Sequence, residues 1–396
     1  MSDFTFSPEE PVNSYRKPDS ALIASVILLW GLGIFTVLIV SFASANSGFA
    51  QQFFPDRYYF FKRQLISSIV GFLGLILFAN FRISFIREKI VPFLLLLSII
   101  LCFLTKCPGI GIARNGASRW IRFPFSTFQP AELAKFALIL FFANYFVRIR
   151  ENQRTWNSWI PVLVLALFDF LILVWQSDMS TAILITIVAF VMFIECGIQM
   201  RHLMKMMILG LSVGMLYLVN VPYRLRRVLS FLSPENFAQT TSYQPIVAQK
   251  AISAGGLFGV GVGSDMTKII IPEVQTDYIF AGWTEAMGFF GVVLFFLVSF
   301  FFYARAWKLS CKCTNMFAAF GSFGCMTMLL FQTLLNCAVA GGVAPSTGIP
   351  LPFFSYGGSS LIVTLSMCGF MINASRYYVN DNFSGMDLLN SEGEEI

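Results

Sequence analysis

Long apolar runs alternate with short polar segments along almost the entire chain of 396 residues. The first run covers residues 21–43 and is too long for the core of a signal peptide, which has about 7–15 residues, so an uncleaved first helix is predicted. Several runs approach the roughly 20 residues that a bilayer requires. The runs lie near residues 21–43, 64–80, 90–104, 131–147, 159–175, 181–198, 203–221, 278–303, 317–340 and 357–374. This pattern predicts an all-α integral membrane protein with about ten transmembrane helices, a long extracytoplasmic loop between helices 7 and 8, and a reentrant-like loop before helix 10.

Composition supports lipid as the solvent of this fold. Hydrophobic residues make up 57% of the chain, charged residues only 12%, and the mean hydropathy is +0.72. A soluble domain of this composition would lack the polar residues needed to cover its surface. The predicted organisation is therefore an N-terminal tail over residues 1–20, a polytopic membrane domain over 21–379 and a C-terminal tail over 380–396.

Basic residues predict the orientation, because short loops rich in Lys and Arg stay in the cytoplasm. With the N-terminus inside, every predicted inside segment is basic, and both tails are cytoplasmic. The basic residues of these segments are Arg16, Lys17, Arg82, Arg87, Lys89, Arg148, Arg150, Arg154, Arg201, Lys205, Arg305, Lys308, Lys312 and Arg376. Some outside segments also carry Lys or Arg, and an anionic ligand would explain these exceptions.

Histidine and cysteine narrow the chemistry. The single histidine, His202, lies on the predicted cytoplasmic side, which argues against a Ser-His triad and against His-ligated metal sites. The eight cysteines are scattered and show no spacing typical of a disulfide framework or a zinc site. Chemistry on the outer face would then depend on Asp, Glu, Lys, Arg or Tyr.

The first unusual outside segment covers residues 109–122 and continues into 128–135. Pro130 suits the first turn of a helix, which would place Glu132 at the positive helix end and Lys135 one turn deeper on the same face. A charge in the membrane is expensive, so the two are expected to pair or to face a polar cavity. Arg119, beside Asn115, could either anchor the interface or bind a phosphate-bearing headgroup.

The second segment covers residues 223–277. Its basic start, 223–234, resembles an amphipathic helix in the membrane interface. The glycine run 255–263 lacks the strand-glycine-helix context of a dinucleotide site and is expected to turn backbone into the membrane. At its end, Glu273 and Asp277 lie at the mouth of the next helix. Asp277 has two interpretations, as the helix cap or as a general base toward a hydroxyl.

The third segment, residues 341–360, contains three prolines and repeated Gly and Ser at membrane depth. Exposed backbone would leave donors and acceptors unsatisfied in lipid, so a packed non-helical loop is predicted. A rigid reentrant plug without a chemical role is the alternative.

Taken together, these segments resemble the SEDS family of bacterial cell-wall polymerases, which comprises FtsW, RodA and SpoVE. The matching stretches follow one another in family order along nearly the whole chain. They are Asn115-Gly-Ala-Ser-Arg-Trp-Ile121, Phe128-Gln-Pro-Ala-Glu-Leu-Ala-Lys135, Gln176-Ser-Asp-Met-Ser-Thr-Ala182, Tyr243-Gln244, residues 255–263, Pro272-Glu-Val-Gln-Thr-Asp-Tyr-Ile-Phe280 and Pro345-Ser-Thr-Gly-Ile-Pro-Leu-Pro-Phe-Phe-Ser-Tyr-Gly-Gly-Ser-Ser360. Within the family, residues 41–45, 58–64 and 259–268 favour the cell-division branch.

The resemblance implies a peptidoglycan glycosyltransferase that polymerises lipid II on the outer face of the bacterial cytoplasmic membrane, at the division septum. It places the catalytic general base at Asp277. Candidate substrate-binding residues are Asn115, Arg119, Arg224, Arg226, Lys268, Glu273, Ser355 and Tyr356, of which Arg119, Arg224, Arg226 and Lys268 would bind the leaving pyrophosphate. Structural or coupling roles are expected for Glu132, Lys135 and Asp178, although Ser177 and Ser180 depart from the family pattern beside Asp178.

The same resemblance implies a class B penicillin-binding protein and other divisome proteins as partners, and no nucleic acid. No cofactor is certain, and a divalent cation could assist at the pyrophosphate. The competing hypotheses are a lipid II flippase with Glu132, Lys135 and Asp169 along an aqueous path, a non-catalytic scaffold, and the elongation or sporulation paralogue of the same polymerase.

Overall fold

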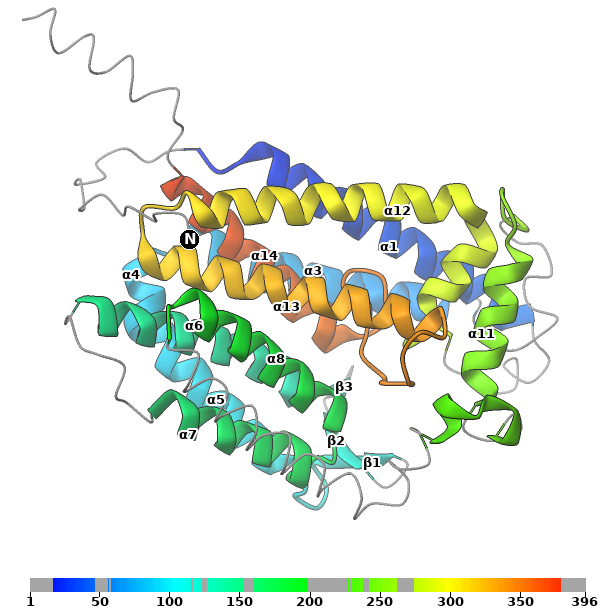
Figure 1. Cartoon of the computed structure of the whole chain (residues 1–396), viewed down its shortest axis with the longest axis horizontal. Coiled ribbons are helices and arrows are strands. Elements are labelled where there is room, and N and C mark those ends of the chain that lie inside the picture. Colours follow the sequence, from blue (N-terminus) through cyan, green and yellow to red (C-terminus); the bar gives the residue numbers. More distant parts are fainter. Residues whose placement is uncertain are drawn as a thin grey trace, which may run out of the picture.

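The structure is a computed structural model that describes residues 17–46, 56, 58–114, 117–122, 127–151, 160–198, 227, 229–237, 242–261 and 274–378. Within these residues, long helices lie side by side in one bundle (Figure 1). The α-helices are α1 (Ser20–Asn46), α3 (Tyr59–Asn80), α4 (Ile83–Phe85), α5 (Val91–Leu104), α6 (Pro130–Glu151), α7 (Ile160–Asp169), α8 (Met179–Glu195), α11 (Tyr243–Ala254), α12 (Ile279–Cys311), α13 (Met316–Ala340) and α14 (Gly358–Ala374). Short π-helical or 3-10 turns are η1 (Ile86–Ile90), η2 (Phe170–Trp175), η3 (Pro234–Phe237) and η4 (Ser375–Tyr377).

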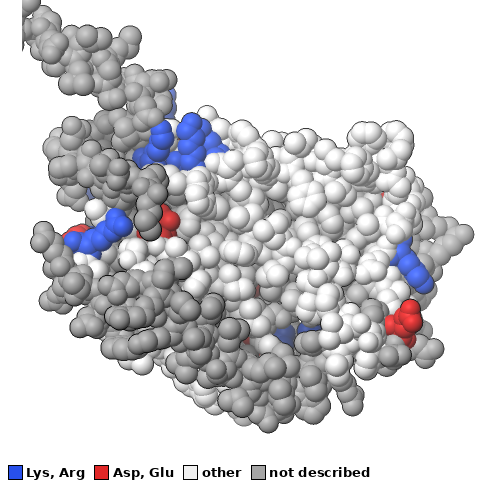
Figure 2. All heavy atoms as spheres, viewed as in Figure 1, with Lys and Arg blue, Asp and Glu red and all other residues white. Residues whose placement is uncertain are grey.

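The two ends of the bundle differ in structure. One end, here called the loop end, carries a small sheet, helix α11, the start of α12 and the loop that follows α13 (Figure 1). The other end, here called the tail end, carries the start of α1 and the ends of α12 and α14. Figure 2 shows most charged side chains of one face gathered toward these two ends, with a broad uncharged band between them. Such a band is what a lipid-facing surface requires.

Six helices are long and apolar enough to cross a membrane, namely α1, α3, α6, α12, α13 and α14. Shorter apolar helices cover residues 160–172 and 179–195. Nine of the ten apolar runs of the sequence fall on described helices, and the run 203–221 lies outside the described residues. The described helices therefore agree with the predicted fold, while the total of about ten stays a prediction.

Burial separates central helices from peripheral ones. In the most apolar 18-residue stretch of each helix, 89% of the residues are buried in α14 and 83% in α6, but only 22% in α3. Helix α3 exposes Ile66, Ile69 and Leu73 on its outer face, which suits contact with lipid. Its inner face lies close to α14 because glycine occupies the contact: a Cβ on Gly369 would lie 2.3 Å from the Leu75 carbonyl oxygen.

The sheet at the loop end departs from the all-α expectation. Strands β1 (Gly111–Arg114), β2 (Ala117–Arg122) and β3 (Thr127–Phe128) form an antiparallel sheet in the order β1-β2-β3. Ile121 pairs with Gly111 on one side and with Phe128 on the other, and its side chain is buried while that of Arg122 is exposed. The alternation of buried and exposed side chains covers only these short strands, so the sequence pattern did not indicate a sheet in a segment rich in glycine and arginine. Helix α6 then begins at Pro130, as predicted.

The tail end is closed by Asp19, which precedes α1. Its backbone N–H donates to Ser375 Oγ at 2.9 Å, and its carboxylate accepts bonds from Leu22 N–H at 2.8 Å and Arg305 Nε at 3.1 Å. Burial alone would raise the pKa of Asp19, but the hydrogen bonds and the charge of Arg305 outweigh it and hold the pKa below its usual value. The carboxylate of Asp19 thus joins α1 to α12, and its backbone N–H adds the contact with η4.

Candidate active site

The segment that carries Asp277, just before α12, is anchored by hydrogen bonds to three consecutive backbone carbonyls. Each carbonyl accepts a hydrogen bond from a different donor on α13 or on the loop that follows it. The bonds are Tyr356 N–H to Gln275 O at 2.7 Å, Ser355 Oγ to Thr276 O at 2.6 Å, and Asn336 Nδ2 to Asp277 O at 2.9 Å. The backbone beneath the Asp277 side chain is therefore fixed on every residue from 275 to 277.

Residues 341–357, here called loop 341–357, enter the bundle between the end of α13 and the start of α14. The loop is non-helical, and residues 351–355 are buried, so the prediction of a packed non-helical loop is confirmed. The Phe353 ring packs edge-on against Phe302 of α12, with ring centroids 5.8 Å apart. A Cβ on Gly33 of α1 would lie 2.2 Å from the Phe353 carbonyl oxygen. Both contacts lie well inside their helices, so the loop is reentrant.

The tip of loop 341–357 lies beside the Asp277 carboxylate. A Cβ added to Gly348 would lie 3.5 Å from Asp277 Oδ2, and Gly348 has φ +74°, a conformation that favours glycine. The Asp277 side chain itself is neither fully buried nor fully exposed. The carboxylate can therefore reach a ligand while its position relative to the loop is defined.

Helix α12 begins one residue later than the capping interpretation of Asp277 requires. Its N-cap residue is Tyr278, which makes no capping hydrogen bond through its side chain. Burial raises the pKa of Tyr278 well above its usual value; the Asp277 carboxylate raises it further and Arg227 opposes the rise. Asp277 and Arg227 thus both act on the electrostatics of Tyr278. The N-cap position of α12 therefore belongs to Tyr278 and not to Asp277.

A break in α12 connects the glycine-rich stretch to this site. Gly288 has φ 64° and ψ −161°, so the helical hydrogen bonds that would cross it are not made. Residues 256–261 take over these bonds in what we call the backbone exchange. It consists of Phe289 N–H to Gly256 O at 2.9 Å, Phe290 N–H to Leu257 O at 3.2 Å, Val260 N–H to Glu285 O at 2.9 Å, and Gly261 N–H to Ala286 O at 3.2 Å.

The backbone exchange explains why this stretch needs glycine. A Cβ on Gly259 would lie 2.1 Å from the Ala286 carbonyl oxygen, and one on Gly255 would lie 2.3 Å from the Thr284 carbonyl oxygen. Residues 255–261 therefore turn against α12, while 262 and 263 lie outside the described residues, and entry of this turn into the membrane stays a prediction. The exchange fixes the direction of residues 279–287, the first part of α12, and so of the segment that carries Asp277.

Arg119 and Asp178 meet between β2 and α8. Asp178 is the N-cap of α8 and accepts bonds from Thr181 N–H at 3.4 Å and Thr181 Oγ1 at 3.0 Å. Arg119 lies 3.8 Å from the Asp178 carboxylate and donates to the Ser177 carbonyl oxygen at 2.6 Å. Asp178 thus has a structural role as the cap of α8. A pyrophosphate-binding role for Arg119 stays a prediction.

Glu132 and Lys135 form the pair expected from their spacing. Lys135 Nζ lies 2.8 Å from Glu132 Oε1, and the two side chains are 2% and 4% exposed. They lie in α6, one of the central helices. Their positions suit a structural or coupling role within the bundle.

Five predicted substrate-binding residues, Asn115, Arg224, Arg226, Lys268 and Glu273, lie outside the described residues. Their neighbour Arg227 is described, and its Nη1 donates to the Ser346 carbonyl oxygen of loop 341–357 at 3.3 Å. From its sequence context, Arg227 was predicted only to lie in the membrane interface. The charge of Arg227 also opposes the rise in the pKa of Tyr278, the residue that follows Asp277.

Two buried amides were not among the predicted site residues. Gln64 of α3 donates to the Ser355 carbonyl oxygen at 3.1 Å and accepts from Gly357 N–H at 3.3 Å. Asn336 of α13 reaches Asp277, as described above. Each is a polar residue in an apolar helix, and this feature of the sequence could have indicated both of them. Ser355, predicted to bind substrate, already donates to Thr276 and accepts from Leu351 N–H at 2.8 Å, so its hydroxyl holds the loop.

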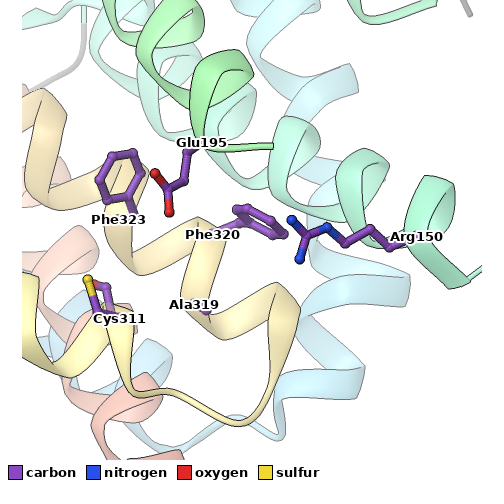
Figure 3. Close-up of a pocket in the computed structure, with 7 residues that line it drawn as sticks. Arg150, Glu195, Cys311, Ala319, Phe320 and Phe323 are labelled. Carbon is purple, nitrogen blue, oxygen red and sulfur yellow. The ribbon is translucent and has the colours of Figure 1, made fainter. Parts of the chain in front are cut away.

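A small cavity of about 70 Å³ lies at the tail end, far from Asp277 (Figure 3). Glu195 and Cys311 line it, and the Arg150 guanidinium lies 5.4 Å from the centre of the Phe320 ring. Cys311 ends α12, whereas Asp277 precedes its start. The cavity therefore belongs to the opposite end of the molecule from the candidate site.

Comparison with known proteins places these features in a family. The sequence model for the FtsW/RodA/SpoVE family, described as "Cell cycle protein", matches residues 20–380. The chain belongs to this family. The chain is 36% identical over 352 residues to a "Probable peptidoglycan glycosyltransferase FtsW" of Geobacter sulfurreducens, covering 88% of this chain and 94% of the relative. It is 32% identical over 363 residues to "Stage V sporulation protein E" of Bacillus subtilis, covering 91% and 98%.

Solved structures agree with the family fold. A chain of a structure described as "Structural coordination of polymerization and crosslinking by a peptidoglycan synthase complex" superposes with a TM-score of 0.73 at 29% identity, covering 92% of this chain and 99% of the other. The rod shape determining protein RodA of Thermus thermophilus gives a TM-score of 0.65 at 25% identity, covering 92% and 98%. The predicted membrane fold and family are confirmed, and among the relatives the resemblance is greatest to proteins named FtsW.

Proposed function

We propose that this chain polymerises lipid II, an undecaprenyl-pyrophosphate disaccharide-peptide, into glycan strands, with Asp277 as the general base. The chain is a peptidoglycan glycosyltransferase of the FtsW/RodA/SpoVE family, in line with the names of its relatives. One observation supports the choice of base: Asp277 is a partly exposed carboxylate whose backbone is held, through three consecutive carbonyls, against loop 341–357 and α13.

In the proposed reaction, Asp277 accepts the proton of an acceptor sugar hydroxyl. The hydroxyl oxygen then forms a bond to the anomeric carbon of the donor sugar, and the bond from that carbon to the pyrophosphate oxygen breaks. Undecaprenyl pyrophosphate leaves with the electron pair of that bond. A positioned general base typically contributes 10²–10⁴-fold to such a step.

The leaving pyrophosphate requires positive charge beside it. The sequence proposes Arg119, Arg224, Arg226 and Lys268 for this role, and Arg227 joins them because it contacts loop 341–357. A divalent cation at the pyrophosphate is also proposed. Within the described residues no group of three His, Cys, Asp or Glu side chains forms a metal site, so no step is assigned to a cation held by the protein. Chelation followed by Mg²⁺ addition in the polymerisation assay tests the cation.

A class B penicillin-binding protein is the proposed partner, because a structural relative belongs to a peptidoglycan synthase complex described as coordinating polymerisation with crosslinking. A septal role with other divisome proteins is proposed from the resemblance to FtsW proteins, with both tails in the cytoplasm. A fluorescent fusion found along the side wall rather than at the septum would favour the elongation paralogue, and one confined to sporulating cells the sporulation paralogue.

The flippase hypothesis needs an aqueous path past Glu132, Lys135 and Asp169. The first two are buried and bound to each other, and the Asp169 carboxylate accepts a bond from Thr186 Oγ1 at 3.0 Å. These contacts do not support an open aqueous path along the three residues. The test uses the purified protein with its transpeptidase partner and fluorescent lipid II, with glycan strands resolved on a gel. Strand formation is expected. Transport of labelled lipid II across liposomes without any strand formation would refute the proposed enzyme.

A further inference from the structure

Asn336 makes an unusual pair of contacts for a residue in an apolar helix. It lies on α13, is 1% exposed, and its Nδ2 donates to Asp277 O and to Ile349 O, each at 2.9 Å. Its Oδ1 is buried and has no hydrogen-bond partner among the described residues. Among the described residues, the side-chain amide of Asn336 therefore bonds only through its two N–H groups, which go to two different segments.

These two segments are the ones that define the surroundings of the proposed base. The Asp277 carbonyl belongs to the base itself, and Ile349 follows Gly348, whose added Cβ would lie 3.5 Å from Asp277 Oδ2. One amide thus fixes the carboxylate-bearing residue and the part of loop 341–357 that the carboxylate faces. A single atom with two hydrogens can bridge two carbonyls in this way, whereas an Asp carboxylate or a Leu side chain offers no such donors.

We propose that Asn336 is a positioning residue for Asp277, which sets the distance between the proposed base and loop 341–357. This inference rests on the proposed function, because it assigns Asn336 a role only through Asp277. A misplacement of about 1 Å in a catalytic group can reduce the rate about 10²-fold. Asn336 therefore affects the rate of the chemical step and leaves lipid II binding largely unchanged.

A simpler interpretation is that Asn336 only satisfies backbone carbonyls at membrane depth. The chain offers a matched control for this interpretation. Asn373 of α14 is 3% exposed, and its Nδ2 donates to Phe78 O at 2.8 Å and to Phe81 O at 2.6 Å, at the tail end of α3. Asn336 and Asn373 share burial, helix environment and two bonds to carbonyls, and they differ in whether Asp277 is one of the acceptors.

The experiment compares Asn336→Ala, Asn336→Ser and Asn373→Ala in full-length protein bound to its transpeptidase partner. Folded protein is isolated by size exclusion, its thermal midpoint is measured, and kcat and KM for lipid II are determined. Both alanine variants are expected to lower the thermal midpoint similarly. Asn336→Ala is expected to lower kcat roughly 10–100-fold with KM within about twofold of wild type. Asn373→Ala is expected to keep the wild-type kcat, and Asn336→Ser to lie between wild type and Asn336→Ala.

Three results would overturn the positioning role: a wild-type kcat in Asn336→Ala, equal losses of kcat in the Asn336→Ala and Asn373→Ala variants, or failure of both Asn336 variants to fold while Asn373→Ala folds. Asp277→Asn, measured in the same assay, distinguishes a failure of the positioning role from a failure of the proposed base. If Asp277→Asn is inactive and Asn336→Ala is fully active, only the positioning role fails. If Asp277→Asn polymerises normally, the proposed base fails and the positioning role fails with it.

Discussion

Replacing Gly259 by alanine tests whether the backbone exchange holds α12 in its broken form. Gly259 has φ +79°, and a Cβ there would lie 2.1 Å from the Ala286 carbonyl oxygen and 2.4 Å from its carbon. Gly261 has φ +88°, and a Cβ there would meet no atom within 4 Å. The two alanine variants therefore share the strain of a left-handed conformation and differ in the clash with α12.

The difference between the variants can be estimated from these contacts. The shared strain costs about 1–2 kcal/mol in each variant. Relief of the clash in Gly259→Ala must move the stretch away from α12, which breaks the bonds of Val260 N–H and Gly261 N–H to the carbonyls of residues 285 and 286. Glu285 and Ala286 are buried, and leaving their carbonyls unsatisfied costs about 1–2 kcal/mol each, so the variants should differ by on the order of 2–4 kcal/mol.

The assay is thermal unfolding of purified protein in detergent, followed by the rate of lipid II polymerisation. For a chain of 396 residues, the expected difference corresponds to a midpoint about 2–5 °C lower in Gly259→Ala than in Gly261→Ala. Polymerisation by Gly259→Ala should fall with it, because residues 279–287 of α12 lose their support. Equal midpoints in the two variants would refute the reasoning, since strain alone would then account for both.

Two further predictions concern ion pairs. Lys135→Met leaves the buried Glu132 carboxylate without its partner and should destabilise the protein by about 3–5 kcal/mol. The double variant Glu132→Gln/Lys135→Met should recover most of this loss of stability. Thermal midpoints measure both effects, and a double variant as unstable as Lys135→Met would contradict the pairing of the two residues. Asp19→Asn should lower the midpoint at neutral pH by breaking the tail-end contact with Arg305. Because the pKa of Asp19 is lowered by folding, its contribution is full above the pKa of the unfolded chain, near 3.9, and is lost as the pH falls through the lower folded value. The deficit of Asp19→Asn should therefore shrink in acid, and a deficit that is constant with pH would contradict this.

The helices of this fold could be predicted from the sequence because each apolar run is local. Pro130 started α6 where proline is favoured, and the spacing of Glu132 and Lys135 placed them on one face, where they do pair. The packed loop was predictable for a similar reason, because its composition excludes an exposed backbone in lipid.

The remaining features depend on contacts between residues far apart in the chain. The backbone exchange joins residues 256–261 to the break at Gly288, and no local pattern indicates which glycine breaks the helix. Asn336 reaches Asp277 across 59 positions, so its role could not be read from α13 alone. The N-cap position of α12, which belongs to Tyr278, was also visible only from the observed start of the helix at Ile279.

The most direct test of the central claim is the turnover of Asp277→Asn in the purified complex with the transpeptidase partner. The amide nearly matches the carboxylate in shape but cannot accept the proton, so the rate of glycan formation should fall at least about 10²-fold while the thermal midpoint stays near that of wild type. Asp19→Asn, the same substitution at the tail end, should polymerise lipid II at the wild-type rate at neutral pH. A wild-type rate in Asp277→Asn would contradict the assignment of Asp277 as the general base.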